Sequence, residues 1–309
     1  MSESKLSTDE QLSSLWGLGG LTWKELGRRV WNEMGQTDLI NRAYELAYNF
    51  LFAVFPLLLF VFSLLGIFAS QGGTLRNNFY TYVHFVLPPS AFDILSHTVR
   101  EITGTAAGKL TFGLLFALYS GSAGMTQLIS TLNAAYAVRE ERSWIKVHLI
   151  SLGLTLAMSV LVIAALFLVL AGAHVISILG REIGLTDAAV VAAKVLQWAL
   201  ALGFVVVAFA VVYYFAPDVE EQHWYWITPG SVIGVLLWAT ASAGLRVYLH
   251  FFNSYTRSYG SLGAVMILML WFYVAGLAVL IGGQINATIE HAAAEHGHIE
   301  AKERGQKAA

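Results

Sequence analysis

The stretch SLGAVMILMLWFYVAGLAVLIGGQIN, residues 261–286, contains no Asp, Glu, Lys or Arg. A helix needs about 20 apolar residues to cross the hydrocarbon layer of a bilayer, so this run is long enough to span a membrane. The whole chain has the same character, because 57% of its 309 residues are hydrophobic and only 12% are charged. Soluble domains carry about 25% charged residues. The composition therefore indicates a membrane protein.

Five further apolar runs are also long enough to cross a bilayer. They occupy residues 43–69, 110–137, 147–172, 191–216 and 227–250. Charged breaks separate them, as in VREERSWIK between the second and third runs. The sequence therefore predicts an all-α, polytopic membrane protein built as a bundle of about six transmembrane helices.

The charged residues suggest how the chain is divided and oriented. We expect a disordered N-terminal tail over 1–20, a single transmembrane domain over 21–290 and a polar cytoplasmic C-terminal tail over 291–309. Lys and Arg collect on the cytoplasmic side of membrane proteins, and here they flank the first span and fill the 138–146 loop. Both termini are thus predicted to be cytoplasmic, although the acidic 217–224 loop, on the same side, does not follow the rule.

Two regions are amphipathic and too polar to span a membrane. In WKELGRRVWNEMG, starting at Trp23, Leu26 and Val30 share a face while Lys24 and Arg28 lie off it, which predicts a surface helix on an anionic inner leaflet. Between the first two spans, residues 75–86 and 92–102 carry apolar stripes on either side of a Pro-Pro-Ser break. These stripes favour a short helical hairpin on the outer surface, with an ordinary interfacial loop as the alternative.

Four polar residues within the apolar runs are candidates for a substrate pathway: Glu45, Asn49, Gln127 and Arg246. Polar and ionisable groups are costly in hydrocarbon, so they usually face protein or water and mark sites. Each candidate has a structural alternative. Glu45 can extend to the interface near Arg42, Gln127 can join helices by hydrogen bonding, and Arg246 can extend to the headgroups or pair with a carboxylate.

Proline and glycine are expected to shape the helices. Pro56 removes a backbone hydrogen bond inside the first span and tends to kink it. Gly124, in the second span, permits close helix approach, as do Gly282 and Gly283 in the last.

Signals for nucleic-acid binding, cofactors and catalysis are weak. The net charge is -2, without the basic field that nucleic-acid binding requires, and the chain has no cysteine for thiolate ligation. The glycines of YGSLG at 259–263 lack the Lys-Ser/Thr of a phosphate-binding loop. The tail residues His291, Glu295 and His296 are one residue out of step with the inverted zinc-protease pattern. We expect no catalytic residue, metal or cofactor.

Two segments resemble the YihY/BrkB family of inner-membrane proteins. AYELAYNFLFAVFPLLLF at 43–60 carries the family-like residues Ala43, Leu46, Ala47, Tyr48 and Pro56. The second segment starts at Ser258 and ends at Glu290. Its family-like residues are Tyr259, Gly260, Leu262, Leu270, Trp271, Tyr273, Leu280, Gly282, Asn286 and Ala287.

The resemblance covers about residues 22–290 and implies a six-helix protein of the bacterial inner membrane. Some members of that family are linked to serum resistance and virulence, and it has carried a mistaken ribonuclease BN label. The absence of a basic groove and of a metal-ligand pattern in this sequence also argues against a ribonuclease.

Two functions remain open on the sequence. The first is a transporter-like protein that moves, or exposes to the opposite leaflet, a small polar or lipid-like substrate. The second is a non-transporting membrane scaffold for envelope integrity or virulence-associated resistance, in which the polar stripes only pack the bundle. Membrane lipids are the expected partners in both, and a homo-oligomer is left open.

Overall fold

The computed structural model describes residues 16–53, 115, 118–182, 186–219, 227–251, 261–297 and 301–307. The chain divides into two compact units, one made of residues 1–51 and 124–309 and the other of residues 52–123. Within the described ranges every regular element is a helix. The predicted all-α, polytopic membrane architecture is confirmed.

The described helices follow one another along the chain with short connections. After the short helix η1 (Leu18–Gly20), they are α2 (Trp23–Gln36), a helix over 39–53, α7 (Ala123–Ala135), α8 (Trp144–Glu182), α9 (Asp187–Phe215), α10 (Pro229–Phe251) and α12 (Ser261–Glu295). Their starts have local causes. The Thr22 hydroxyl accepts a hydrogen bond from the Glu25 amide while the Glu25 carboxylate binds the Thr22 amide, which makes a capping box for α2.

Four helices are long and apolar enough to span a membrane: Trp144–Ala165, Ala188–Phe215, Pro229–Leu249 and Val265–Glu295. They match the four predicted spans that begin at residues 147, 191, 227 and 261. α8 has 39 residues and is thus about 58 Å long, at 1.5 Å per residue, which exceeds the bilayer. Only parts of the first two predicted spans are described, as the 39–53 helix and α7. Pro56 and the predicted 75–102 hairpin lie outside the described residues.

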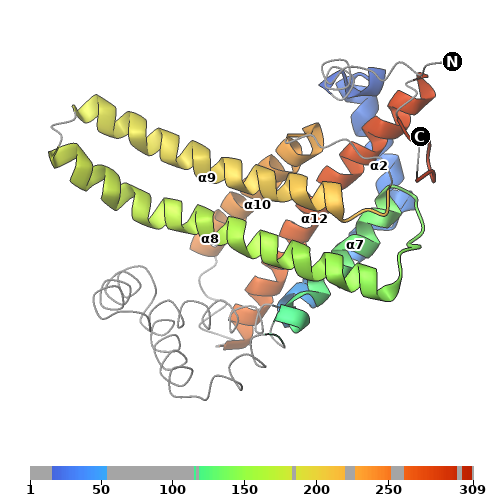
Figure 1. Ribbon diagram of the computed structural model, residues 1–309, viewed down its shortest axis with the longest axis horizontal. Helices are drawn as coiled ribbons and strands as arrows, with labels where there is room; N and C mark the ends of the chain where they lie inside the picture. Colours follow the sequence, from blue (N-terminus) through green and yellow to red (C-terminus); the bar gives the residue numbers. More distant parts are fainter. Residues whose placement is uncertain are drawn as a thin grey trace. The chain divides into compact units, whose positions relative to one another are not determined.

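The helices of the larger unit pack in pairs. α8 and α9 run side by side, as do α10 and α12 (Figure 1), and α9 also contacts α10. Gln197 is buried between the first pair, where its side-chain amide donates to the carbonyl oxygens of Leu168 and Val169 at 2.9 and 3.0 Å. This arrangement satisfies a polar side chain within an apolar helix pair.

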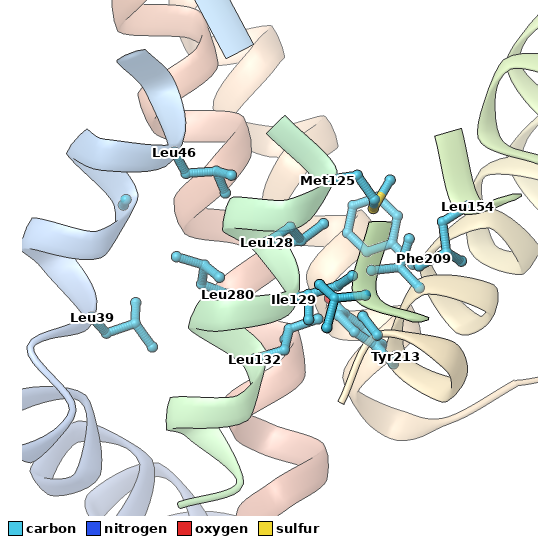
Figure 2. Close-up of a cluster of buried hydrophobic side chains, with 14 of the residues drawn as sticks. Leu39, Leu46, Met125, Leu128, Ile129, Leu132, Leu154, Phe209, Tyr213 and Leu280 are labelled. Atoms are coloured by element: carbon cyan, nitrogen blue, oxygen red, sulfur yellow. The ribbon is translucent and has the colours of Figure 1, made fainter. Parts of the chain in front are cut away.

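α7 lies at the centre of the hydrophobic core. Its Leu128, Ile129 and Leu132 face three sets of neighbours. Figure 2 shows Leu39 and Leu46 of the 39–53 helix, Leu280 of α12, and Phe209 and Tyr213 of α9 around them. The side chains of Leu46 and Leu132 have no exposed surface. This core fixes the 39–53 helix against α7, and those two helices carry most of the polar residues described below.

The amphipathic helix α2 packs on protein with the face that was expected to lie on lipid. Leu26 and Val30 are buried against Ile285 and Ile289 of α12. Trp23 and Trp31 remain exposed. The prediction for the buried face was therefore wrong, because α12 extends its apolar surface beyond residue 286 and offers α2 a protein partner.

A carboxylate reinforces the contact between α2 and α12. Glu33 accepts hydrogen bonds from the Gln284 side-chain amide at 2.7 Å and from the Thr288 hydroxyl at 2.6 Å. Both donors are buried on α12. The ionisable residue of α2 thus satisfies two polar side chains that would otherwise be unpaired in an apolar environment.

Glycines allow α9, α10 and α12 to approach closely. A Cβ added to Gly230 would overlap the carbonyl oxygen of Gly282, and one added to Gly282 would overlap the Tyr213 hydroxyl. That hydroxyl donates to the carbonyl oxygen of Val279 at 2.7 Å. Gly283 likewise leaves room for the side chain of Leu132. These contacts require small residues at the crossing point.

Candidate functional site

Two pathway candidates from separate parts of the sequence meet directly. The Gln127 side-chain amide on α7 donates a 2.8 Å hydrogen bond to the Glu45 carboxylate on the 39–53 helix. One turn further along that helix, Asn49 donates to the Glu45 backbone oxygen at 2.8 Å. On α7, the hydroxyl of Thr126 lies 2.9 Å from that of Ser151 on α8. We name Glu45, Asn49, Thr126 and Gln127 the polar seam.

A cavity of about 350 Å³ opens beside the polar seam. Its lining comes from the 39–53 helix, α7, the 138–143 connection and the start of α8. The polar lining residues are Arg42, Thr126, Ser130, Asn133 and Glu140, and the apolar ones are Ile129, Ala134, Val138 and Val147. The cavity therefore combines hydrogen-bonding groups with an apolar wall, the composition typical of small-molecule sites.

Arg42 brings a cation to this cavity. Its Nε donates to the Thr37 backbone oxygen at 2.9 Å, which fixes the side chain at the start of the 39–53 helix. The two terminal guanidinium nitrogens have no ion-pair or hydrogen-bond partner within the described residues. Arg42 is half-buried, so its charge lies partly out of water without a carboxylate to balance it.

The carboxylate of Glu140, in contrast, is fully engaged. Arg142 binds it through two nitrogens, each at 2.7 Å, and the buried Asn133 amide donates to it at 2.8 Å. Burial raises the pKa of Glu140, but the hydrogen bonds from Arg142 and Asn133 outweigh that effect and hold the pKa below its usual value. Glu140 is thus ionised and already neutralised by its partners.

Asp218 connects this end of α7 and α8 to the end of α9. The Asp218 amide donates to the Asn133 side-chain oxygen at 2.7 Å, and its carboxylate lies 3.4 Å from Arg142 Nε. The carboxylate also accepts from the Glu141 amide at 2.9 Å. The basic loop at 138–146 and the acidic loop that starts at residue 217 therefore lie together at one end of the bundle, and the pairing of opposite charges explains the acidic exception.

The C-terminal residues bind the same network. Lys307 Nζ lies 2.6 Å from Asp218 and 3.0 Å from Glu141, and the nearly buried Lys302 lies 3.3 Å from Glu290. Burial raises the pKa of Asp218, but hydrogen bonds from Lys307 and Glu141 bring it below its usual value. Burial lowers the pKa of Lys307, and its carboxylate partners raise it further. Residues 301–307 are therefore held against the helix ends, which differs from the solvated tail expected.

The structure groups only some of the predicted site residues. Glu45, Asn49 and Gln127 form the seam, whereas Arg246 is exposed on α10 and does not line the cavity. Gly124 is buried in α7. Gly282 and Gly283 lie at the crossing with α9 and α10. Pro56 is not among the described residues. A role for Arg246 remains a separate prediction.

Several residues of the site were not singled out by the sequence. Arg42 was treated only as a possible neighbour of Glu45, and Asn133 and Ser130 only as polar residues beside a stripe. Glu140 and Asp218 lie in short charged loops, where charges are common in membrane proteins. The one usable signal was the opposite charge of the two loops.

Comparisons with known proteins agree on one family. Residues 30–306 match the family described as Virulence factor BrkB. The chain is 31% identical to the "Putative ribonuclease-like protein YfkH" of Bacillus subtilis, over 86% of this chain and 94% of that protein. It is 25% identical to a "UPF0761 membrane protein" of Tolumonas auensis, over 85% and 83%, and to one of Pseudomonas aeruginosa, over 78% and 57%. No solved structure matches the chain.

Proposed function

Because the chain belongs to the Virulence factor BrkB family of membrane proteins, we propose that it acts as a transporter-like protein of the bacterial inner membrane. It moves, or exposes to the opposite leaflet, a small polar or lipid-like substrate. Both termini are cytoplasmic in this proposal, so the loops at 138–146 and 217–224 and the C-terminal residues lie at the inner face.

The observation that carries the proposal is the position of the cavity next to the polar seam. The cavity holds Arg42 and Ser130, and the Glu45–Gln127 hydrogen bond lies one helical turn further along the same two helices. A substrate in the cavity would thus meet further polar groups in the direction of the membrane interior. Polar side chains at such depth usually mark a pathway.

A non-enzymatic role fits the cavity better than catalysis. General base catalysis at a serine or threonine hydroxyl requires a free base within hydrogen-bond distance. Glu140 is the carboxylate of the cavity lining, and Arg142 and Asn133 already occupy it. The ribonuclease-like name belongs to the Bacillus relative and is not part of our proposal for this chain.

The proposal is tested by lipid translocation in proteoliposomes. A phospholipid with a fluorescent headgroup is added to vesicles that contain the purified chain, and dithionite quenching reports how much of it has crossed. We expect faster translocation than in protein-free vesicles. We also expect Gln127→Leu to reduce it several-fold, because leucine removes the hydrogen bond that orients Glu45.

The matched control is Gln36→Leu, which makes the same change at an exposed position of α2. Arg246→Leu, measured in parallel, decides whether the exposed guanidinium on α10 belongs to the same path. If the wild-type chain translocates no faster than empty vesicles, the lipid form of the proposal is wrong. If Gln127→Leu and Gln36→Leu behave alike, the seam is not part of the path.

A further inference from the structure

We propose that the cavity binds the phosphate group of a membrane phospholipid headgroup, with the Arg42 guanidinium as its main contact. This inference rests on the proposed function, since it names the substrate class for the same cavity. It is carried by the free donors of Arg42, the charges around the cavity, its hydroxyl groups and its depth in the membrane.

Arg42 has the free donors that a phosphate group requires. Its Nε is bound to the Thr37 backbone oxygen, so the two terminal nitrogens remain as donors with no partner in the described part of the chain. Guanidinium groups bind phosphate through two parallel hydrogen bonds, which are charge-assisted and about twice as strong as neutral ones. A half-buried guanidinium without a carboxylate favours an anionic ligand.

The other charges near the cavity do not cancel Arg42. Glu140 is the carboxylate among the lining residues, and Arg142 binds both of its oxygens. Arg142 also reaches Asp218, which Lys307 neutralises in turn at 2.6 Å. Each carboxylate of the network has its own cation, so the guanidinium of Arg42 is the unbalanced charge of the cavity.

Hydroxyl groups provide further donors for phosphate oxygens. Ser130 and Thr126 lie one turn apart on α7 and both line the cavity. The volume of about 350 Å³ is near the lower limit for ligand pockets, about 300 Å³. A headgroup with its phosphate fits such a volume, whereas the acyl chains must remain outside in the bilayer.

The cavity lies at the depth where phospholipid phosphates are found. The third membrane span begins at Trp144, and Val147, less than one turn inside it, lines the cavity. Trp144 is exposed, which is typical of tryptophan at the boundary between headgroups and hydrocarbon. The apolar wall formed by Ile129, Val138 and Val147 can contact the glycerol and the first acyl carbons.

The experiment measures the binding of short-chain lipids to the purified full-length chain in detergent. Dioctanoyl phosphatidylglycerol is titrated, and bound lipid is counted by native mass spectrometry. We expect Arg42→Gln to weaken binding about tenfold, which is the loss of one or two charge-assisted hydrogen bonds. Arg28→Gln, the same change at an exposed position of α2, should bind like the wild type. Dioctanoylglycerol, which lacks the phosphate, should bind at least tenfold more weakly.

A second variant protects the test if Arg42→Gln is poorly folded, as judged from its melting temperature. Ser130→Phe fills the cavity from an exposed position without changing any charge, and it should also abolish phosphatidylglycerol binding. Equal binding by wild type, Arg42→Gln and Ser130→Phe would overturn the inference. Inorganic phosphate that binds as tightly as phosphatidylglycerol would overturn the lipid assignment and indicate a site for the free anion.

Failure of the inference and failure of the proposed function give different results. If phosphatidylglycerol binds the wild type but not Arg42→Gln, and neither protein translocates it, the binding site stands and the transport proposal is wrong. If both proteins translocate phosphatidylglycerol equally well, transport stands and the role of Arg42 is wrong.

Discussion

Gln127 donates a 2.8 Å hydrogen bond to Glu45, although the two residues are 82 positions apart in the sequence. The bond joins the 39–53 helix to α7 directly beside the cavity. An unpaired carboxylate or amide in an apolar environment is costly, so each residue provides the partner that the other needs. This pairing accounts for the presence of both polar side chains in otherwise apolar helices.

The coupling between Glu45 and Gln127 can be measured with a double-mutant cycle. We expect the single changes Glu45→Ala and Gln127→Ala to be non-additive, with a coupling free energy of about 1 kcal/mol, the usual range for hydrogen bonds in membrane proteins. The measurement is the free energy of unfolding in detergent micelles. The pair Asn41→Ala and Gln127→Ala serves as the control and should be additive, since Asn41 bonds to Asp38 instead. Additivity for Glu45 and Gln127 would exclude a direct interaction.

The membrane spans could be predicted from the sequence, but their partners could not. A bilayer requires a long run of apolar residues, so α8, α9, α10 and α12 were recognisable by length and composition alone. Glu45 and Gln127 were each conspicuous because polar groups in hydrocarbon are rare. Their pairing depends on how the 39–53 helix packs on α7, and no local pattern encodes that contact.

The same limit explains why the amphipathic face of α2 was assigned to lipid. A stripe such as Leu26 and Val30 predicts an apolar surface without saying whether lipid or protein covers it. The partner is the end of α12, where Ile289 and Ala292 extend the apolar surface. Arg42 was not selected for a related reason, because basic residues flank most membrane spans.

Substitution at the crossing of α9, α10 and α12 should be destabilising. We expect Gly282→Ala to lower the free energy of unfolding by about 1–3 kcal/mol, the usual cost of overpacking, because its methyl group would overlap the Tyr213 hydroxyl. Gly203→Ala in α9 is the matched control, since a Cβ there meets nothing within 4 Å. That change should be neutral or stabilise by up to about 1 kcal/mol. Equal effects of the two changes on the melting temperature would contradict the close approach.

The contact between the C-terminal residues and Asp218 should depend on pH. A carboxyl whose pKa is lowered by folding contributes stability that is lost as the pH falls through its folded pKa, here below the usual value of 3.8 for Asp218. Lys307 has a raised pKa, so its contribution is lost only as the pH rises above 10.5. We therefore expect residues 301–307 to remain bound at neutral pH and to dissociate in acid below about pH 4.

Spin labels can follow this contact by electron-spin distance measurements. The chain has no native cysteine, so labels are placed through Glu303→Cys and Arg139→Cys, both at exposed positions. Asp218→Asn should lengthen the distance at pH 7, whereas Asp38→Asn, the same change at an exposed position in the connection before the 39–53 helix, should not. A distance that is unchanged in acid and in Asp218→Asn would show that this ion pair does not hold the C-terminal residues.

The most direct test of the pathway is cysteine accessibility along the polar seam in intact membranes. Single changes to cysteine at Glu45, Asn49, Gln127 and Ser130 are compared with changes at Leu156 and Leu202, which are exposed on α8 and α9 and should face lipid. A charged maleimide reacts only where water reaches the thiol. We predict that the first set is labelled and the second is not, which is the result for a water-accessible path. Equal protection of both sets would contradict the pathway and favour a scaffold whose polar residues only pack the bundle.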